Sequence, residues 1–525
     1  MGGYNAAAWL VDRHIAEGRG GRTAFRVVGG ADAADAADAA DAATSYAELQ
    51  REVFRVQRAL RTLDVRRGSR VALVLDDELA FPAWFLGALR SGVVPVPLST
   101  MLTGADLAAI TADANADAVV LSQPYAGYAG ALTAANPDLR HAVVVGAPEP
   151  AAGSRVAVHA WEDFADRDEA PVAPTTEDSP AFWLYSSGTT GVPKGVMHRH
   201  ASLQATADTY GANILEIGPE DCTYSVAKLF FAFGLGNSLT FPLSVGACSV
   251  LSPVRPTPSA VAALVTAERP TLFFASPGFV AAVLDAGLPA ETFASVRTTV
   301  TAGEALPADL QRRFSTTFGH PVLDGIGTTE CLHIFLSNAK GAERPGTSGR
   351  PVPGYEPRLV DDEGNVVTAT DTPGYLQVRG PSLATGYWSR DAATRATFFG
   401  PWMSTGDVYT VSDDGYWTFL GRNSDMIKAG GIWVSPAEVE AVLIEHPDVL
   451  EAAVVGSRDD DGLEITVAFV VARQGATIDE AAIEAHCRER MAAFKRPRRL
   501  LAVDGLPKTA TGKIQRFALR QRLGS

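Results

Sequence analysis

The 525-residue sequence has few of the features that mark secreted, metal-binding or membrane-spanning chains. Its four cysteines, Cys222, Cys248, Cys331 and Cys487, show no CxxC spacing. This argues against a zinc site or a disulfide framework and favours reduced thiols in the cytoplasm. No uninterrupted apolar run approaches the ~18 residues of a membrane-spanning helix. The N-terminus has no basic segment followed by a long apolar one, so we expect no signal peptide.

Positive charge is also scarce, since 45 lysines and arginines stand against 60 aspartates and glutamates, for a formal net charge of −15. An acidic chain is poorly suited to sequence-independent binding of nucleic acid or of an anionic membrane, because both carry negative charge. We therefore expect neither among its partners. An anionic substrate would need cations placed locally around its binding site.

The length and composition indicate a globular protein with more than one domain, since 46% of the residues are hydrophobic and 20% are charged, and single cores rarely exceed roughly 250–300 residues. Strand-like runs at 70–75, 116–122, 141–146, 271–276 and 298–303 alternate with helical stretches. This order is typical of an α/β fold with parallel-rich sheets flanked by helices. In such folds, ligands bind at loops beyond the carboxyl ends of the strands.

Residues 423–525 have the pattern of a smaller α+β domain, which leaves residues 1–422 as the large N-terminal domain. Ser435, Pro436 and Glu438 form a helix-start signature: a capping serine, proline at the first helical position, and glutamate three residues after the cap. The strand-like stretches EAAVVGS and EITVAFVV follow, and then a helical pattern around IDEAAIEAHCRERM.

One segment has low complexity: from Ala31 to Ala43 an aspartate recurs at every third residue. It lies between a predicted strand, TAFRVV, and a predicted amphipathic helix that begins at TSYAELQ. We interpret it as an exposed loop insertion, with a short alanine-rich helix as the alternative. Neither interpretation implies a function.

The stretch YSSGTTGVPKG, from Tyr185 to Gly195, combines glycines and hydroxyl side chains with a single cation, Lys194. Glycines allow backbone N–H groups to approach a phosphate, hydroxyl groups add donors, and lysine adds a point charge. The order differs from GxxxxGK[ST], because Lys194 lies three residues after Gly191 and is followed by Gly195. The stretch therefore predicts a polyphosphate-binding loop of a kind other than the P-loop.

Four further stretches occur downstream: DGIGTTE (324–330), STGD (404–407), GRNSDMIKAGG (421–431) and PKTATGKIQR (507–516). Together with 185–195, and in this order, they resemble the motifs of the adenylate-forming superfamily. That superfamily comprises acyl- and aryl-CoA ligases, the adenylation domains of peptide synthetases, and luciferases. The resemblance implies activation of a carboxylic acid by ATP.

The resemblance also implies an ATP site. Its phosphate-binding residues would be Ser186, Ser187, Gly188, Thr189, Thr190 and Lys194. Its adenine and α-phosphate side would comprise Ala302, Gly303, Glu304, Asp324, Gly325, Ile326 and Thr328. The Asp407 carboxylate would accept hydrogen bonds from both ribose hydroxyls, with Arg422 assisting. Glu330 would hold Mg²⁺, which bridges phosphates.

In this family a carboxylate attacks the α-phosphorus of ATP, and the C-terminal domain then turns about a hinge to complete a tunnel for the pantetheine thiol. Negative charge builds at the α-phosphorus, so a cation there stabilises the transition state, and the resemblance assigns this role to Lys513. Lys428 matches a lysine that serves thioester formation, and Gly430 and Gly431 would line the thiol tunnel. The hinge position, often aspartate in the family, is Ser424 here, which leaves the balance between the two orientations open.

The segments KLFFAFGLGNSLTFPLSVGA (228–247) and GTTECLHIFLSN (327–338) resemble the benzoate–CoA ligase branch. Domains that activate amino acids place an aspartate near the start of the first segment, where it pairs with the α-ammonium group of the substrate. This chain has phenylalanine and alanine there, so a buried ammonium group would remain unpaired. A planar aromatic acid fits such a wall instead. The expected acyl pocket comprises Phe231, Ala232, Phe233, Gly234, Gly327, His333 and Ile334, with Phe231 between the pocket and the tunnel.

Several alternatives remain open at this level. The thiol belongs either to coenzyme A or to the phosphopantetheine of an acyl carrier protein, and the basic stretch FKRPRR (494–499) suits either partner or a solvated surface. A non-catalytic nucleotide-binding regulator is a further alternative, but it predicts loss of Lys513, Asp407 or Glu330, and all three are present. We expect a monomer or a homodimer.

Two expectations concern histidines and one a cysteine. His333 either caps the far end of the bound ring or is a core histidine with its hydrogen bonds satisfied. His198 and His200 are expected at the surface, where a helix begins. Cys331 is expected to be a small buried hydrophobe and not a nucleophile.

Overall fold

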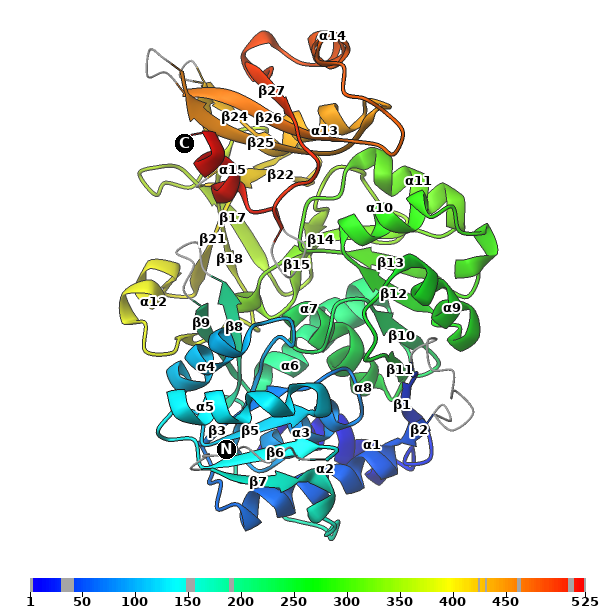
Figure 1. The fold of residues 1–525 in the computed structure, drawn as a ribbon, viewed down its shortest axis with the longest axis vertical. Helices are drawn as coiled ribbons and strands as arrows, with labels where there is room; N and C mark the ends of the chain where they lie inside the picture. Colours follow the sequence, from blue (N-terminus) through cyan, green and yellow to red (C-terminus); the bar gives the residue numbers. More distant parts are fainter. Residues whose placement is uncertain are drawn as a thin grey trace.

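The computed structural model describes residues 3–29, 42–147, 156–187, 193–423, 425–429, 432–459, 464–508 and 514–523. A large N-terminal part and a smaller C-terminal part both mix helices with sheets (Figure 1). The predicted fold class is confirmed.

The largest sheet has nine strands and a parallel centre. Its order is β16 (Arg350–Pro351), β15 (Ile334–Ser337), β14 (Val322–Gly327), β13 (Thr298–Thr301), β12 (Leu272–Ala275), β10 (Cys222–Ser225), β11 (Cys248–Leu251), β1 (Thr23–Val27) and β2 (Ala42–Ser45). The six strands from β14 to β1 run parallel, while β2, β15 and β16 pair antiparallel at the edges. The carboxyl ends of β10, β12, β13 and β14 therefore meet at one edge of the sheet.

A second, fully parallel sheet orders its strands as β4 (Val94–Pro97), β3 (Arg70–Val74), β5 (Ala118–Ser122), β6 (His141–Val145) and β7 (Ala157–Ala160). Helices α2 (Tyr46–Thr62) and α3 (Ala80–Arg90) share one hydrophobic core with strands of both sheets, including Phe25 and Val120. Every residue of α3 is buried, which suits a helix that is apolar on all sides. The N-cap of α2 is a reciprocal capping box of Ser45 and Glu48.

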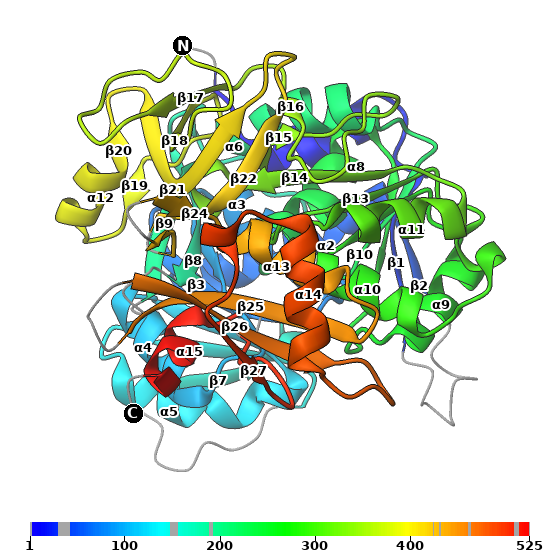
Figure 2. The same ribbon diagram turned by 90° about the horizontal axis from the view of Figure 1, so that it is seen from above.

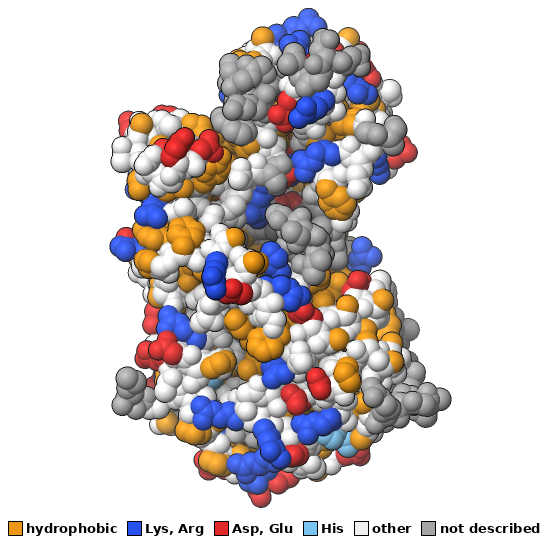
Figure 3. Space-filling view, turned by 90° about the vertical axis from the view of Figure 1, so that its left-hand side faces the viewer, with side chains coloured by type: hydrophobic (Ala, Val, Ile, Leu, Met, Phe, Trp, Pro, Cys, Tyr) orange, Lys and Arg blue, Asp and Glu red, His pale blue; other side chains and the backbone are white. Residues whose placement is uncertain are grey.

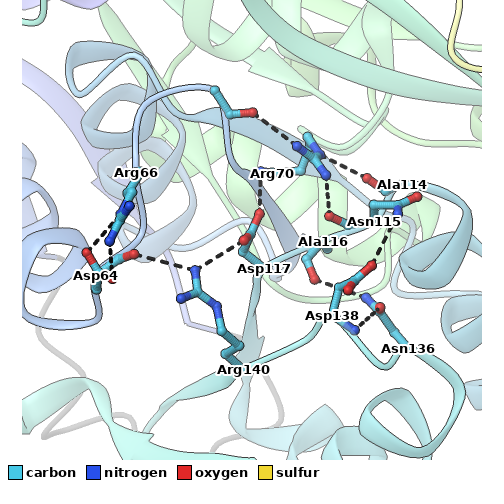
Figure 4. Close-up of polar contacts among 11 residues, drawn as sticks. Asp64, Arg66, Arg70, Ala114, Asn115, Ala116, Asp117, Asn136, Asp138 and Arg140 are labelled. Carbon is cyan, nitrogen blue, oxygen red and sulfur yellow. Dashed lines mark hydrogen bonds and ion pairs between the residues drawn. The ribbon is translucent and has the colours of Figure 1, made fainter.

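Arginines tie the amino ends of this second sheet together (Figure 4). Arg70 donates to the carbonyl oxygens of Ala114 (3.0 Å) and Asn115 (2.7 Å). Arg140 lies 3.1 Å from the Asp117 carboxylate, which also accepts from the backbone N–H of Arg70. These residues line a cavity of about 560 Å³. Because Arg70 and Arg140 are already hydrogen-bonded and the strands' carboxyl ends lie at the opposite edge, we do not place the ATP site here.

The remaining helices of the N-terminal part cover the sheets: α1 (Arg13–Ala16), α4 (Gly104–Asp113), α5 (Ala129–Ala135), α6 (Ala201–Thr206), α7 (Ala232–Leu235), α8 (Phe241–Val245), α9 (Pro258–Glu268), α10 (Pro277–Asp285), α11 (Ala308–Phe318) and α12 (Asp391–Thr397). Figure 1 shows α9, α10 and α11 together on one side of the nine-stranded sheet. Among the described residues, no helix combines the length and the apolar character needed to cross a membrane.

Two antiparallel units complete the N-terminal part. The first is β19 (Gly386–Tyr387), β9 (Pro193–Arg199) and β8 (Pro180–Ser187). The second is β17 (Glu356–Val360), β18 (Gly374–Arg379), β21 (Trp402–Val411) and β20 (Phe398–Phe399), with β22 (Trp417–Arg422) also paired to β21. On β9, Gly195, Val196 and His198 are buried, and the His198 ring stacks on that of Phe182 in β8 with centroids 5.1 Å apart.

The packing around β9 overturns one expectation. His198 and His200 were expected at the surface, but they are 1% and 0% exposed. His198 Nε2 lies 2.8 Å from the carbonyl oxygen of Thr329, and His200 Nδ1 accepts from the backbone N–H of Ala6 at 3.1 Å. Burial lowers the pKa of both imidazoles to about 4.

The C-terminal part consists of β23 (Ile427–Ala429), β24 (Ile432–Val434), α13 (Pro436–Ile444), β25 (Val449–Arg458), β26 (Glu464–Ala472), α14 (Glu480–Arg490), β27 (Arg499–Ala502) and α15 (Arg516–Leu523). Figure 2 shows α13 and α14 beside the β25–β26–β27 sheet, and Figure 3 shows this part as a lobe above the larger body. The predicted helix start is present, because Ser435 Oγ accepts from the N–H of Glu438. Arg473 lies 3.6 Å from Asp285 of α10 and so links the two parts.

Most of the low-complexity segment, residues 31–41, lies outside the described residues. Its last two residues, Ala42 and Ala43, form the start of β2, which pairs with β1. That end is therefore a strand, and neither the loop nor the helix interpretation applies to it.

Candidate functional site

Most of the predicted site residues lie at one edge of the nine-stranded sheet. The segments 226–234, 302–304 and 328–333 follow the carboxyl ends of β10, β13 and β14, respectively. Because these strands are parallel, the segments meet at the place where α/β folds bind ligands.

The predicted phosphate loop forms the turn of the β8–β9 hairpin. Ser186 pairs with Lys194 and Ser187 with Pro193, so the strands meet at the base of this turn. Gly188, Thr189 and Thr190 lie outside the described residues, and of Ser187 only the main chain is described. The hairpin therefore fixes the base of the loop and the position of its lysine.

Tyr387, which the sequence motifs did not single out, connects the predicted phosphate and metal residues. Its hydroxyl donates to Glu330 Oε1 at 2.9 Å, and its ring centroid lies 5.3 Å from Nζ of Lys194. The tyrosine is positioned by β19, which pairs with β9. A cation and a carboxylate thus lie at the same aromatic ring, an arrangement suited to a phosphate chain and its counterion.

Glu330 is compatible with Mg²⁺. Its side chain is half-buried, and Tyr387 donates to one of its two carboxylate oxygens, Oε1. Mg²⁺ at phosphate sites is commonly bound through one or two carboxylates, with substrate phosphates and waters as the other ligands. Among the described residues, no group of three or more histidine, cysteine or acidic side chains is arranged to hold a metal ion. A single carboxylate is the arrangement expected when the nucleotide supplies further ligands.

The turn predicted to lie beside the adenine follows β13 directly. Ala302 is buried, Gly303 is exposed and has φ +99°, and Glu304 is half-buried. The positive φ of Gly303 lies in the region that favours glycine, so the sharp turn after the strand depends on this residue. The turn presents main-chain groups at the edge of the sheet where the site is expected.

Asp324 supports this turn from the neighbouring strand. Its Oδ1 accepts from Thr301 Oγ1 at 2.8 Å, and burial raises its pKa to about 7. Gly325 and Ile326 follow in β14, and the Thr328 hydroxyl accepts from the N–H of Cys331 at 3.1 Å. Asp324 is 5% exposed, so it acts on the turn from beneath.

The predicted ribose residues are directly opposite each other on β21 and β22. Asp407 and Arg422 are register partners, and Arg422 Nε lies 3.0 Å from Asp407 Oδ1. The aspartate side chain is 2% exposed and the arginine side chain 42% exposed. The ion pair holds the carboxylate in one orientation, as a receptor for two hydroxyl groups requires.

His333 is the centre of an aromatic cluster in the predicted acyl pocket. Its ring centroid lies 5.5 Å from that of Phe233, 4.9 Å from that of Tyr210 and 4.6 Å from that of Phe241. Its Nε2 lies 3.1 Å from Asn237 Oδ1. Burial lowers its pKa to about 3, so the imidazole is neutral at ordinary pH. His333 is therefore a core histidine with a hydrogen-bond partner at Nε2, and its place at the far end of a bound ring stays a prediction.

Close backbone approaches shape this pocket at three glycines. A Cβ on Gly234 would lie 2.1 Å from the carbonyl oxygen of Lys228, and one on Gly327 would lie 2.6 Å from that of His333. A Cβ on Gly236 would lie 2.4 Å from Cδ2 of His333. These positions exclude larger side chains because the space is already occupied.

The other predicted pocket residues belong to two hydrophobic clusters. Phe231 is half-buried and lies edge-on to Phe230 at 4.6 Å between centroids. Ala232 begins α7 and is half-buried, and Ile334 begins β15 and is 1% exposed. Phe231 and Ala232 pack against the core of α2 and α3, while Ile334 lies in the same cluster as Phe233, so the position of Phe231 between pocket and tunnel stays a prediction. Cys331 is fully buried and burial raises its pKa to about 12, which confirms its expected character.

The residues predicted for the C-terminal part are described only in part. Lys513, Ser424, Gly430 and Gly431 lie outside the described residues, and of Lys428 only the main chain is described, paired with Trp433 in the β23–β24 hairpin. The loop that carries Lys513 is closed at its base, because Lys508 and Ile514 form an antiparallel bridge. This closure fixes the two ends of the loop.

Arg516 anchors the same loop. Its Nη2 lies 2.7 Å from both carboxylate oxygens of Glu440. Burial acts to lower the pKa of Arg516, but Glu440 outweighs it and the pKa is raised, with Glu304 acting in the same direction. Glu304 belongs to the turn after β13, so the base of the loop approaches the nucleotide edge of the sheet. Figure 1 shows this chain descending from β27 toward β14 and β15.

Sequence reasoning missed three residues of the site. Tyr387 lies in a GYW stretch with no chemical signature of its own, so no local signal identifies it. Gly236 and Asn237 lie within the quoted pocket segment, in GLGN, where a polar residue inside an apolar run is a usable signal of a buried hydrogen bond.

Comparisons with known proteins cover nearly the whole chain and agree with the site geometry. Residues 13–388 match the family described as AMP-binding enzyme, and residues 438–513 match the AMP-binding enzyme C-terminal domain. The chain is 44% identical to the benzoate–CoA ligase of Thauera aromatica, over 98% of this chain and 96% of that protein. It is 42% identical to the 4-hydroxybenzoate–CoA/benzoate–CoA ligase of Rhodopseudomonas palustris, over 99% of this chain and 94% of that protein.

A solved structure gives the same result. The fold is similar to the crystal structure of a benzoate CoA ligase from Burkholderia xenovorans LB400, with a TM-score of 0.87, 42% identity, and coverage of 98% of this chain and 100% of that one. Since the first family match alone spans residues 13–388, the chain belongs to the AMP-binding enzyme family.

Proposed function

We propose that the protein is an AMP-forming benzoate–CoA ligase, which converts benzoate or a close analogue, ATP and coenzyme A into the aryl thioester, AMP and pyrophosphate. The observation that carries the proposal is the neutral aromatic cluster around His333, in a chain that is 44% identical to a benzoate–CoA ligase over its whole length. Aromatic side chains stack on a planar ring, and Asn237 and His333 add polar atoms without charge.

In the first half-reaction, an oxygen of the aryl carboxylate attacks the α-phosphorus of ATP, which forms the aryl-adenylate and releases pyrophosphate. Negative charge grows at the α-phosphorus, and a cation preorganised there lowers the barrier. We assign this role to Lys513, because Arg516 and the Lys508–Ile514 bridge hold the base of its loop near the turn after β13.

We propose the remaining nucleotide contacts as follows. Lys194 would bind the phosphates, together with Ser186 and the loop residues 187–190. Asp407, held by Arg422, would bind the ribose hydroxyls. The adenine would lie along Ala302, Gly303 and Glu304, supported by residues 324–326 and Thr328. When bound at Glu330, Mg²⁺ would neutralise phosphate charge.

In the second half-reaction, the thiol attacks the carbonyl carbon of the adenylate and AMP leaves. We assign Lys428, Gly430 and Gly431 to this step and propose that residues 423–525 turn about Ser424 between the steps. The Arg473–Asp285 pair, at 3.6 Å, is a contact that this rotation would break. Free coenzyme A is the proposed acceptor in view of the relatives' names, and a carrier protein is the alternative. We propose a monomer or homodimer in the cytoplasm, where ATP and coenzyme A are available.

An acid panel tests the proposal. Benzoate, hydroxybenzoates, phenylalanine and palmitate are compared by pyrophosphate release, with coenzyme A or a pantetheinylated carrier protein as acceptor. We expect benzoate or a close analogue to give the highest kcat/KM and coenzyme A to be the better acceptor. A higher kcat/KM for palmitate or phenylalanine would contradict the aromatic-acid assignment.

The catalytic assignment has a separate test. We expect Lys513→Ala to slow adenylate formation by at least ~100-fold, as for loss of a main electrostatic stabiliser. ATP–pyrophosphate exchange within a few-fold of the wild-type rate would remove Lys513 from this role.

A further inference from the structure

Two cysteines outside the proposed site lie directly opposite each other on adjacent strands. Cys222 opens β10, Cys248 opens β11, and the two are register partners in this parallel pair. Opposed residues of neighbouring strands point to the same face of a sheet. Both thiols are free and half-buried.

The backbone holds both residues in place. The N–H of Cys222 donates to Thr271 Oγ1 at 3.0 Å, and the N–H of Cys248 donates to the carbonyl oxygen of Asp221 at 3.2 Å. Neighbouring strands lie about 4.7–4.9 Å apart, and disulfides span Cα separations of about 4.4–6.8 Å. The two sulfur atoms can therefore meet without a change in strand pairing.

The surroundings lower the pKa of the Cys248 thiol. The neighbouring Cys222 thiol and the Arg26 guanidinium act in this direction, while burial and Glu268 oppose it. Cys248 Sγ donates to the carbonyl oxygen of Ser249 at 3.8 Å. Arg26 Nη1 in turn lies 3.2 Å from the Glu268 carboxylate. A thiolate next to a second thiol is the arrangement of a reactive cysteine and its resolving partner.

The other two cysteines are more deeply buried and lie apart from each other. Cys331 and Cys487 are 0% and 2% exposed. Burial raises the pKa of both thiols. They lie in separate hydrophobic clusters, one in the N-terminal part and one in the C-terminal part. They therefore serve as internal controls.

We propose that Cys222 and Cys248 are a site of reversible oxidation that forms an intramolecular disulfide in the presence of a peroxide. The Cys248 thiolate attacks one peroxide oxygen, which gives a sulfenic acid and releases the other oxygen as hydroxide. The sulfur of Cys222 then displaces the sulfenic oxygen, and the thiol proton leaves with it as water. Overall, two thiols and one hydrogen peroxide give one disulfide and two waters.

This disulfide is expected to be readily reduced. Both cysteines are only half-buried, and exposed disulfides are more easily reduced than buried structural ones. A dithiol should therefore restore both thiols without unfolding the protein.

The experiment treats the full-length protein with hydrogen peroxide and measures its mass, its thiol count after denaturation, and its linked peptides. We expect a loss of two of the four thiols, a mass decrease of about two hydrogens, one peptide pair joining Cys222 to Cys248, and full reversal by dithiothreitol. Retention of all four thiols, or linkage of any other pair, would overturn the proposal.

Two variants separate the reactive cysteine from its partner. In Cys222→Ser, the disulfide should be absent and Cys248 should be trapped as a sulfenic acid by a cyclic 1,3-diketone. Cys331→Ser is the matched control and should form the same disulfide as the wild type. If no sulfenic acid is trapped at Cys248 in a folded Cys222→Ser protein, the proposed order of attack is refuted. A disulfide in that variant would refute the pairing of Cys222 with Cys248. Peptide mapping of the wild type tests the pairing even if this variant does not fold.

Discussion

The ion pair between Arg516 and Glu440 allows a direct test of how the C-terminal part holds the loop with the proposed catalytic lysine. Arg516 Nη2 lies 2.7 Å from both oxygens of Glu440, whose Oε1 also accepts from the N–H of Val454 at 2.7 Å. The side chains are 23% and 12% exposed, so neither charge is well hydrated. In Arg516→Met, the Glu440 carboxylate would remain buried without its cation.

The expected magnitude follows from this burial. Removing one partner of a buried pair costs about 3–5 kcal/mol, because the other charge is left uncompensated. Every 1.4 kcal/mol is a factor of ten, so opening of the α15 segment should become roughly 10²–10⁴-fold more frequent. Because Lys513 lies three residues before Arg516, we expect adenylate formation to fall with it.

Hydrogen exchange of the amides in α15 measures the opening, and ATP–pyrophosphate exchange measures adenylation. Glu440→Gln is a graded variant, since its amide oxygen still accepts from Val454 but carries no charge. The double variant Glu440→Leu/Arg516→Met buries no charge and should be more protected than Arg516→Met alone. The surface pair Arg488–Glu484, whose side chains are 61% and 57% exposed, supplies the control, and Arg488→Met should change stability by at most about 1 kcal/mol.

The reasoning fails if Arg516→Met leaves exchange in α15 and the adenylation rate within a few-fold of the wild type. It also fails if the effects of Glu440→Leu and Arg516→Met, each measured as a single variant, simply add in the double variant, because independent effects would mean that the two side chains do not interact.

Three other predictions concern the core, the pocket and the second half-reaction. Burial lowers the pKa of His198 and His320 to about 4, whereas the same histidines in the unfolded chain bind protons below about pH 6.5. The free energy of unfolding should therefore fall as the pH falls from about 6.5 to 4. His320→Gln should reduce the proton uptake on unfolding, as measured by urea titration at several pH values. Gly234→Ala would place Cβ 2.1 Å from a carbonyl oxygen and should destabilise the protein by about 1–3 kcal/mol. The control Gly278→Ala, whose Cβ would have no atom within 4 Å, should not destabilise it, and equal melting temperatures for the two variants would contradict this expectation. Lys428→Ala should retain benzoyl-adenylate formation and lose transfer from preformed adenylate to the thiol, and the reverse pattern would exclude the proposed division of roles.

Patterns of short range were predictable from the sequence. The alternation of strand-like and helical stretches indicated the α/β fold, and Ser435 caps its helix as its spacing with Glu438 predicted. The motif resemblance also assigned Asp407 and Arg422 to one ribose site, and the two residues are register partners in the structure. These features depend on backbone propensity and on groups only a few residues apart, which the linear sequence displays.

The contacts that complete the site depended on tertiary structure. Asn237 meets His333 from 96 residues away, and Tyr387 brings its hydroxyl to Glu330 from 57 residues away. His198 was expected at the surface and is buried, because Phe182 stacks on its ring and Thr329, 131 residues away, meets its Nε2. Burial and long-range hydrogen bonds arise when separate segments pack together, and packing reflects the sum of many weak contacts over the whole chain, so no local pattern in the sequence encodes which distant residues meet.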